Sequence, residues 1–220
     1  MGKNSKKQDG KENIMHLHRI NMIICVALIL CFGCATKEKP NMTSESVRTG
    51  TQVTFKGKPH KLLGSPIKVG DGLPSVSLVD AVSLSEVDLS KEKGSVLFLS
   101  IVASIDTPVC EEQTHYLGEE GDSLAPRIKR IVISRDTPFA QKRFADEAKL
   151  QDLQYLSDYK EGAFGRATGL LIDDLMLLAR AIIIVDQKGI VQYIQVVPEI
   201  TTLPDMQAAF EKAREIAEEN

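Results

Sequence analysis

The sequence predicts an α/β fold in which a central mixed sheet has helices on its faces. Two near-continuous apolar runs, "SVLFLSIV" (95–102) and "ARAIIIVD" (179–186), are typical of strands that are covered on both sides. Segments with helical periodicity lie between and after these runs. The chain of 220 residues is 43% hydrophobic and 26% charged, which suits one domain of ordinary size plus an extension.

The other elements follow in order along the chain. Residues 51–64 predict an N-terminal β-hairpin, because two β-forming stretches flank the polar tripeptide Lys56-Gly57-Lys58. The pattern then predicts a short strand at 75–80, a strand at 127–134, a helix at 137–150, a strand at 190–197 that forms a hairpin with 179–186, and an amphipathic C-terminal helix at 203–220. The sequence contains no internal repeat and predicts no second domain.

Residues 1–33 are expected to be a signal peptide of the lipoprotein type. A Lys-rich start precedes the apolar stretch Met22–Phe32, which is shorter than the ~20 residues that a membrane-spanning helix needs. The stretch ends in "CFGC", which resembles a bacterial lipobox, whose last cysteine is lipidated and becomes the mature N-terminus. We therefore expect Cys34 to carry lipid and to hold the protein at the bacterial cell envelope. Met15 is a plausible true start, and an uncleaved anchor or an ordinary secretory signal is the alternative.

After the signal, residues 34–50 are expected to form a lipidated flexible linker, and residues 51–220 the folded domain. The linker sequence "ATKEKPNMTSESVRTG" offers almost nothing to bury. Without residues 1–33 the chain has 22 basic and 28 acidic side chains, a formal charge of -6 against -3 for the whole chain. A mildly acidic domain with no basic block is not expected to bind nucleic acid.

The four cysteines leave one thiol in the predicted domain. Cys25 and Cys31 lie in the predicted signal, Cys34 would carry lipid, and Cys110 is alone in the rest of the chain. An exported domain with one cysteine has no internal disulfide, so Cys110 is either a packed side chain or a functional thiol. The predicted domain has no CxxC pair and no phosphate-binding glycine loop, and its two histidines have no partners at metal-ligand spacing, so we expect neither a metal nor a cofactor.

The segment "VASIDTPVCEEQ" (102–113) predicts that Cys110 lies in the first turn of a helix. Thr107 is a good N-cap and Pro108 is favoured as the first helical residue, which makes Cys110 the third. Unpaired backbone N–H groups and the helix dipole favour thiolate over thiol at this position. Three nearby acidic side chains would act in the opposite direction, so a reactive thiolate needs a cationic partner. Inert packing is the alternative interpretation.

Four segments, in the same order, resemble the thiol peroxidase group of the peroxiredoxins. They are "SIDTPVC" (104–110), "SRDTPFAQKRF" (134–144), "LLARAIIIVD" (177–186) and "PEITTLPDM" (198–206). The resemblance implies a thioredoxin-like fold with an N-terminal hairpin. It also implies a thiol-dependent peroxidase that reduces hydrogen peroxide and organic hydroperoxides, and it implies a homodimer.

The resemblance assigns roles to three residues. Cys110 matches the peroxidatic cysteine, whose thiolate attacks a peroxide oxygen and becomes sulfenic acid. Thr107 matches the hydroxyl residue that hydrogen-bonds the peroxide, and could instead be only an N-cap. Arg180 matches the guanidinium that pairs with the thiolate and with charge developing on the leaving oxygen. The alternative for Arg180 is a structural ion pair with Asp or Glu.

Two positions depart from the family pattern. Ala103 stands where a proline normally opens the active-site motif, and Ala145 stands where the resolving cysteine normally lies. We therefore expect a one-cysteine cycle that is completed by an external thiol, such as a thioredoxin-like protein or a small thiol. The alternative is a degenerate peroxiredoxin fold that serves as a binding or redox-sensing lipoprotein without turnover.

Overall fold

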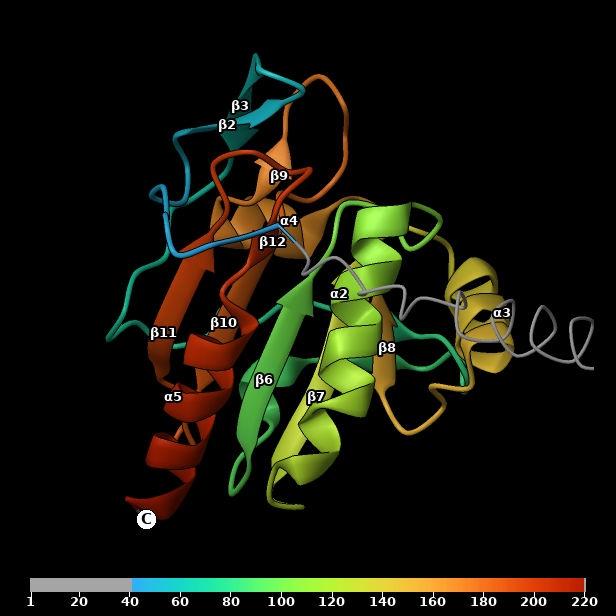
Figure 1. The fold of residues 1–220 in the computed structure, drawn as a ribbon, viewed down its shortest axis with the longest axis vertical. Coiled ribbons are helices and arrows are strands. Elements are labelled where there is room, and N and C mark those ends of the chain that lie inside the picture. The colour runs from blue at the N-terminus through green and yellow to red at the C-terminus, as the bar shows by residue number, and fades with distance from the viewer. Residues whose placement is uncertain (1–40, 220) are drawn as a thin grey trace, which may run out of the picture. The chain divides into compact units, whose positions relative to one another are not determined.

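A seven-stranded mixed sheet forms the core of the computed structural model, which describes residues 41–219 (Figure 1). In sheet order the strands are β11 (Val191–Val196), β10 (Ala181–Val185), β6 (Val96–Ile101), β7 (Ile128–Ser134), β8 (Gln154–Ser157), β4 (Leu78–Asp80) and β5 (Glu86–Val87). β6 pairs in parallel with β7, and β7 with β8, whereas β10 lies antiparallel to β6 and β11 antiparallel to β10. The mixed sheet predicted from the two apolar runs is confirmed.

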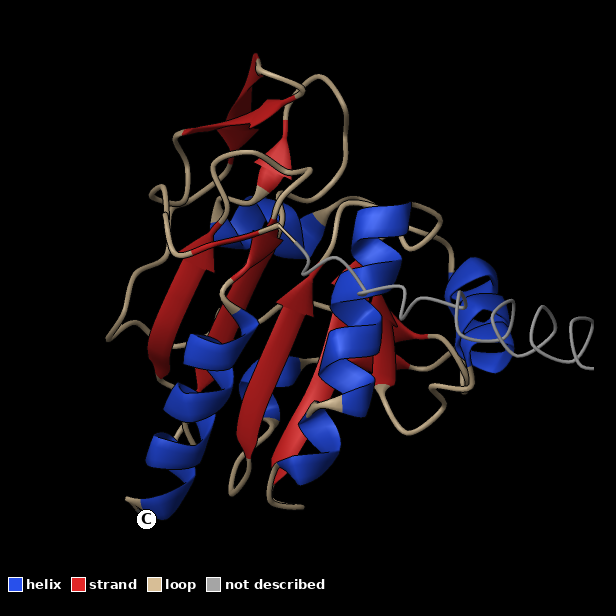
Figure 2. Ribbon diagram, in the orientation of Figure 1, coloured by secondary structure: helices blue, strands red, loops and turns tan. Residues whose placement is uncertain are grey.

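Helices cover both faces of this sheet, as Figure 2 shows for the front face. The helices are α2 (Pro108–Glu119), α3 (Pro138–Ala148), α4 (Ala163–Thr168) and α5 (Met206–Glu218), with short 3-10 turns at Leu89–Lys91 and Gly121–Ser123. Side chains of α2, α3 and α5 share one core with alternate sheet residues, and α4 shares the other core with the remaining ones. Because β6 and β10 lie between two cores, every residue in both strands is buried.

The predicted N-terminal hairpin is confirmed as β2 (Gln52–Phe55) and β3 (Lys58–Leu63). Its two-residue turn has positive φ at Lys56 and Gly57, 51° and 77°, as the twist of a tight hairpin requires. β3 also pairs with β9 (Leu171–Ile172), a strand that the sequence analysis did not predict. This small sheet lies beyond the central sheet, on the side where the C-terminal end of β6 points (Figure 1).

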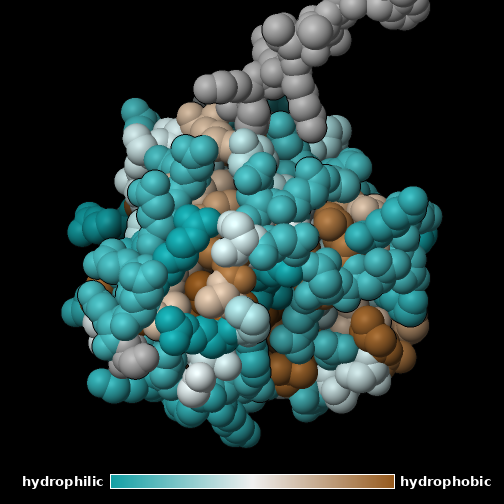
Figure 3. Space-filling model, turned by 60° about the horizontal axis from the view of Figure 1, so that its bottom comes forward, coloured by the Kyte–Doolittle hydropathy of each residue, from teal (hydrophilic) through white to brown (hydrophobic). Residues whose placement is uncertain are grey.

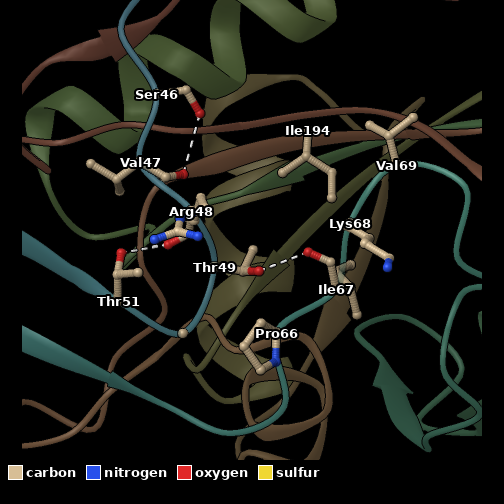
Figure 4. Close-up of a pocket in the computed structure, with 11 residues that line it drawn as sticks. Ser46, Val47, Arg48, Thr49, Thr51, Pro66, Ile67, Lys68, Val69 and Ile194 are labelled. Atoms are coloured by element: carbon tan, nitrogen blue, oxygen red, sulfur yellow. Dashed lines mark hydrogen bonds between the residues drawn. The ribbon is translucent and has the colours of Figure 1, made fainter.

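Residues 41–50, which the sequence analysis assigned to the linker, pack against the domain. β1 (Met42–Thr43) pairs in parallel with β12 (Leu203–Pro204). The segment is polar because its groups complete hydrogen bonds at the sheet edge: the Val196 amide donates to Ser46 Oγ at 3.0 Å, and Gln195 Nε2 donates to the Thr43 carbonyl at 2.7 Å. Residues 46–51, residues 66–69 and Ile194 line a pocket of about 500 Å³ (Figure 4).

On the face in Figure 3 the described surface is largely hydrophilic, and its apolar side chains form small separate groups. The large apolar side chains that are exposed are Phe55, Val69, Val82, Leu84, Phe139, Tyr159 and Met176. Within residues 41–219 no helix has the length and hydropathy needed to span a bilayer. The predicted signal peptide and Cys34 lie outside the described residues.

Glu199, in the loop after β11, ties that loop to the hairpin. Its carboxylate accepts hydrogen bonds from the amides of Lys56 and Gly57, both at 3.0 Å, and from the hydroxyls of Thr54 and Thr201 at 2.9 and 2.8 Å. Partial burial alone would raise the pKa of Glu199, but these hydrogen bonds together hold it at about 2. The ionised carboxylate is therefore a structural part of this end of the molecule.

We predict that Glu199→Gln lowers the free energy of unfolding at pH 7 by about 1 kcal/mol. Because the pKa is about 2 in the folded chain against 4.5 in the unfolded reference, the carboxylate stabilises the fold above pH 4.5, and this contribution is lost as the pH falls towards 2. Urea unfolding at pH 7 and pH 3 measures the effect, with the exposed Glu147→Gln as control. Equal losses for Glu199→Gln at the two pH values would contradict the prediction.

Candidate active site

Cys110 is the third residue of α2, as the sequence predicts. β6 ends at Ile101, a short loop follows, and Thr107 is the N-cap with extended backbone before Pro108 opens the helix. The Cys110 amide donates to the Thr107 carbonyl at 3.0 Å. The thiol is free and its side chain is 0% exposed. The first turn of α2 thus holds a reduced sulfur inside the core, beside the ends of the central strands.

Strand register brings Arg180 to Cys110. Ala181, the first residue of β10, pairs with Ile101, the last residue of β6, so the residue before β10 lies beside the loop that leads into α2. Arg180 Nη2 donates to Cys110 Sγ at 3.3 Å, and the arginine is only 2% exposed. The structure therefore joins two of the predicted site residues, which are 70 positions apart in the sequence.

Nε and Nη1 of Arg180 donate to uncharged oxygen atoms. Nε donates to the Ile200 carbonyl at 2.8 Å, and Nη1 donates to Gln113 Oε1 at 2.6 Å and to the Val109 carbonyl at 3.4 Å. Among residues 41–219 no carboxylate makes an ion pair with Arg180, so the alternative of a structural ion pair is wrong for the described part. A buried guanidinium without a carboxylate keeps its charge available to a thiolate.

Gln113 is a member of this site that the sequence analysis missed. It lies one turn after Cys110 on α2, is 0% exposed, and donates through Nε2 to Ser100 Oγ of β6 at 2.7 Å. Its amide oxygen Oε1 accepts from Arg180, so Gln113 fixes the guanidinium relative to both the helix and the sheet. The available signal was its spacing of three residues from Cys110, which places a polar amide on the same buried face and demands partners for it.

Thr107 lies next to the site, but its side chain differs from the expectation. Its hydroxyl donates to the Ser104 carbonyl at 3.0 Å and makes no capping bond to the helix. The backbone of Thr107 is the N-cap as predicted, while a side-chain cap is wrong. The hydroxyl bonds to Ser104 and not to the helix because the loop turns tightly here, and the Thr107 amide also donates to the Ser104 carbonyl at 3.3 Å. The hydroxyl oxygen retains lone pairs that can accept a hydrogen bond.

The two departures from the family pattern are both buried in the hydrophobic core that also contains Cys110. Ala103 is 7% exposed and Ala145, on α3, is 4% exposed, and both belong to the same hydrophobic core as Cys110. Methyl groups therefore occupy these positions. Neither can shape backbone as a proline does, and neither can react with an oxidised sulfur.

The acidic side chains near Cys110 are directed to the surface. Asp106 pairs with Arg143 of α3 at 3.1 Å, and both side chains are more than half exposed. Glu111 and Glu112 are exposed on α2. Water screens exposed charges, so the buried Arg180 is the charged group best placed to act on the sulfur.

The two histidines that the sequence analysis excluded as ligands have carboxylate partners. His60 Nδ1 lies 2.7 Å from Asp174, and His115 Nδ1 lies 3.0 Å from Glu119. Within the described residues no group of three metal-ligating side chains is present.

Comparisons with known proteins show the family of this chain. The model of the Redoxin family matches residues 68–210. A thiol peroxidase of Halalkalibacterium halodurans is 42% identical over 74% of this chain and 96% of its own length, and one of Bacillus subtilis is 38% identical over 74% and 96%.

Solved structures give the same result. A peroxiredoxin-like protein from Aquifex aeolicus has a TM-score of 0.72 at 35% identity and covers 77% of this chain and 99% of its own. A thiol peroxidase from Chromobacterium violaceum has a TM-score of 0.64 at 25% identity and covers 74% and 96%. The chain therefore belongs to the redoxin family and, within it, to the thiol peroxidase group of the peroxiredoxins.

Proposed function

We propose that this protein is a one-cysteine thiol peroxidase that reduces hydrogen peroxide and organic hydroperoxides. Membership of the thiol peroxidase group makes it a peroxidase of the oxidoreductase class. The finer proposal rests on the contact between Arg180 Nη2 and Cys110 Sγ at 3.3 Å. It is the observation that turns a lone buried cysteine into a candidate nucleophile.

In the oxidative step, the Cys110 thiolate attacks one oxygen of the peroxide and the O–O bond breaks. Sulfur is oxidised to sulfenic acid, and the other oxygen leaves as an alcohol or water after taking up a proton. Negative charge grows on the leaving oxygen, and the guanidinium of Arg180 is placed to stabilise it. Thr107 supplies the hydroxyl that would orient the peroxide at the mouth of the site.

In the reductive half, an external thiol attacks the sulfenic acid, water leaves, and a mixed disulfide forms. A second thiol then releases reduced Cys110 and leaves as a disulfide. The described domain holds no second cysteine for this step. Because Cys110 is fully buried, both peroxide and reductant reach Sγ only when the first turn of α2 moves, and a small thiol needs less movement than a thioredoxin-like protein.

The second candidate function is a degenerate peroxiredoxin fold that binds a partner or senses oxidants without turnover. Ala103 and Ala145 favour it, because a proline that shapes the pocket and a cysteine that resolves the sulfenic acid are both replaced. The enzyme is the better supported of the two, because the groups that activate the sulfur are present and in contact.

The rate of reaction with peroxide separates the two candidates. Stopped-flow mixing of the reduced protein with hydrogen peroxide should give a second-order rate constant far above that of a free thiol at matched thiolate fraction. Adding a dithiol reductant in excess should then sustain turnover. A rate constant no higher than that of the free thiol would reject the enzyme and favour the sensing or binding role.

We also propose that a lipid on Cys34 anchors the domain to the membrane of a bacterial envelope, after removal of residues 1–33. The polar residues 35–40 then join the lipid to the domain. The mass of the mature protein from membranes tests this: it should begin at Cys34 and carry diacylglyceryl and acyl groups. A mass without them would refute the anchor.

We also propose a homodimer, from the family alone. Sedimentation at micromolar concentration tests it.

A further inference from the structure

We infer that Asp136 is a positioning residue for the reactive sulfur, although it does not touch Cys110. This inference rests on the proposed peroxidase function. Asp136 lies two residues after β7, and its carboxylate accepts a hydrogen bond from Ser104 Oγ at 2.8 Å and another from the Ile105 amide at 2.7 Å. Both donors belong to the loop between β6 and α2, which delivers Cys110.

Parallel strand pairing explains why these groups meet. Ile101 of β6 pairs with Ile133 of β7, and Ser134 of β7 pairs with Ser157 of β8, so all three strands end at one edge of the sheet. The carboxylate of Asp136 bridges from the loop after β7 to the loop after β6. Its backbone carbonyl accepts from the hydroxyl of Ser157 at the end of β8. Asp136 is thus anchored on the sheet itself.

A series of hydrogen bonds continues from Asp136 to the sulfur-bearing turn. The Ser104 carbonyl accepts from the amide and the hydroxyl of Thr107 at 3.3 and 3.0 Å, and the Thr107 carbonyl accepts from the Cys110 amide at 3.0 Å. Arg180 is held by the Ile200 carbonyl, outside α2, and by Gln113, which donates to Ser100 of β6. If the loop shifts the first turn of α2 relative to these two groups, the distance between the sulfur and the guanidinium changes.

This chain has particular need of such a restraint. Ala103 opens the loop, and alanine leaves its backbone freer than proline would. A second side-chain contact reaches the loop from α3, the ion pair Asp106–Arg143, but it is exposed and exposed ion pairs contribute little. The two short hydrogen bonds to the carboxylate of Asp136 are therefore the strongest side-chain restraint on the loop that leads into the first turn of α2.

Two substitutions separate the hydrogen bonds of Asp136 from its charge. Asp136→Ala removes both bonds. Asp136→Asn removes the charge but can keep both bonds, because the amide oxygen accepts from Ile105 and the amide nitrogen donates to the hydroxyl of Ser104. Asp80→Ala is the matched control, since Asp80 holds a distant turn by accepting from the Val82 and Ser83 amides at 3.0 and 2.8 Å.

The measurements are made on the full chain. One is the second-order rate constant with hydrogen peroxide, and the other is the pH profile of iodoacetamide alkylation, followed on the peptide that contains Cys110. We expect Asp136→Ala to lower the rate constant about tenfold or more and to move the midpoint of the alkylation profile to higher pH. The rate constant of Asp136→Asn should stay within about threefold of that of the unchanged protein, and the rate constant of Asp80→Ala should equal that of the unchanged protein.

The outcomes are distinguishable. A rate constant and an alkylation midpoint for Asp136→Ala that equal those of the unchanged protein would overturn the inference. It would also be overturned if the alkylation midpoint moved equally to lower pH in Asp136→Ala and Asp136→Asn, because the charge of Asp136 and not its position would then be acting. If Asp136→Ala does not fold, Ser104→Ala removes one of the two bonds and should give a smaller change in the same direction. If the unchanged protein reacts no faster than a free thiol, the peroxidase proposal fails, whereas the alkylation profile still tests Asp136.

Discussion

Cys110→Ser is expected to abolish peroxide consumption by this protein. The serine hydroxyl is close in size to the thiol and can still accept from Arg180, so the fold should be kept. An alcohol is not ionised at neutral pH and is a far weaker nucleophile, so no oxygen is transferred. Loss of peroxide in the presence of a dithiol, measured at pH 7, should fall to the rate of the buffer and reductant alone.

The matched control for this experiment is Cys34→Ser, which removes the predicted lipid site and leaves the domain unchanged. Purified Cys34→Ser protein should consume peroxide at the rate of the unchanged chain. Residual turnover in Cys110→Ser above the background would mean that another group reacts with peroxide, and would remove Cys110 from the centre of the mechanism.

Arg180→Lys is expected to slow the reaction with peroxide by roughly 100-fold. A lysine keeps the positive charge, but one ammonium on a flexible chain cannot donate to Ile200, Gln113 and the sulfur in the geometry of the planar guanidinium. The thiolate loses its fixed donor, and the positive charge is no longer held in place beside the leaving oxygen. The midpoint of the alkylation profile of Cys110 should therefore move to higher pH.

Arg130→Lys is the control for general damage from losing a partly buried arginine. Arg130 donates to the Leu117 and Gly118 carbonyls at 3.2 and 2.8 Å, at the opposite end of α2 from Cys110. This variant should lose stability without a change in the rate with peroxide. If Arg180→Lys and Arg130→Lys slowed the reaction equally, the contact at the sulfur would have no special role.

Local patterns predicted the elements that depend on their own residues. The apolar runs at 95–102 and 179–186 became β6 and β10, because strands between two helical layers bury both faces. Pro108 after Thr107 placed the start of α2 correctly, since these residues favour a helix start by their own geometry. Cys110 was therefore located in its turn before any tertiary contact was known.

The parts that were missed depend on contacts between distant elements. Gln113 gains its role only because the register of β10 against β6 brings Arg180 above it. Asp136 acts through the parallel pairing of β6 with β7. Residues 41–50 look like a linker by composition, yet their polar groups complete the edge of the sheet. Each of these contacts joins separate segments, so the pattern of one segment does not identify the partner in the other.

Intact mass spectrometry of the reduced protein after one equivalent of hydrogen peroxide tests the one-cysteine mechanism most directly. We predict a rapid gain of one oxygen at Cys110, which a sulfenic acid reagent traps and an added thiol removes, and no gain in Cys110→Ser. An oxygen gained no faster than by an ordinary thiol would contradict the account. It would mean that Ala103 marks a site that has lost its reactivity despite the contact with Arg180.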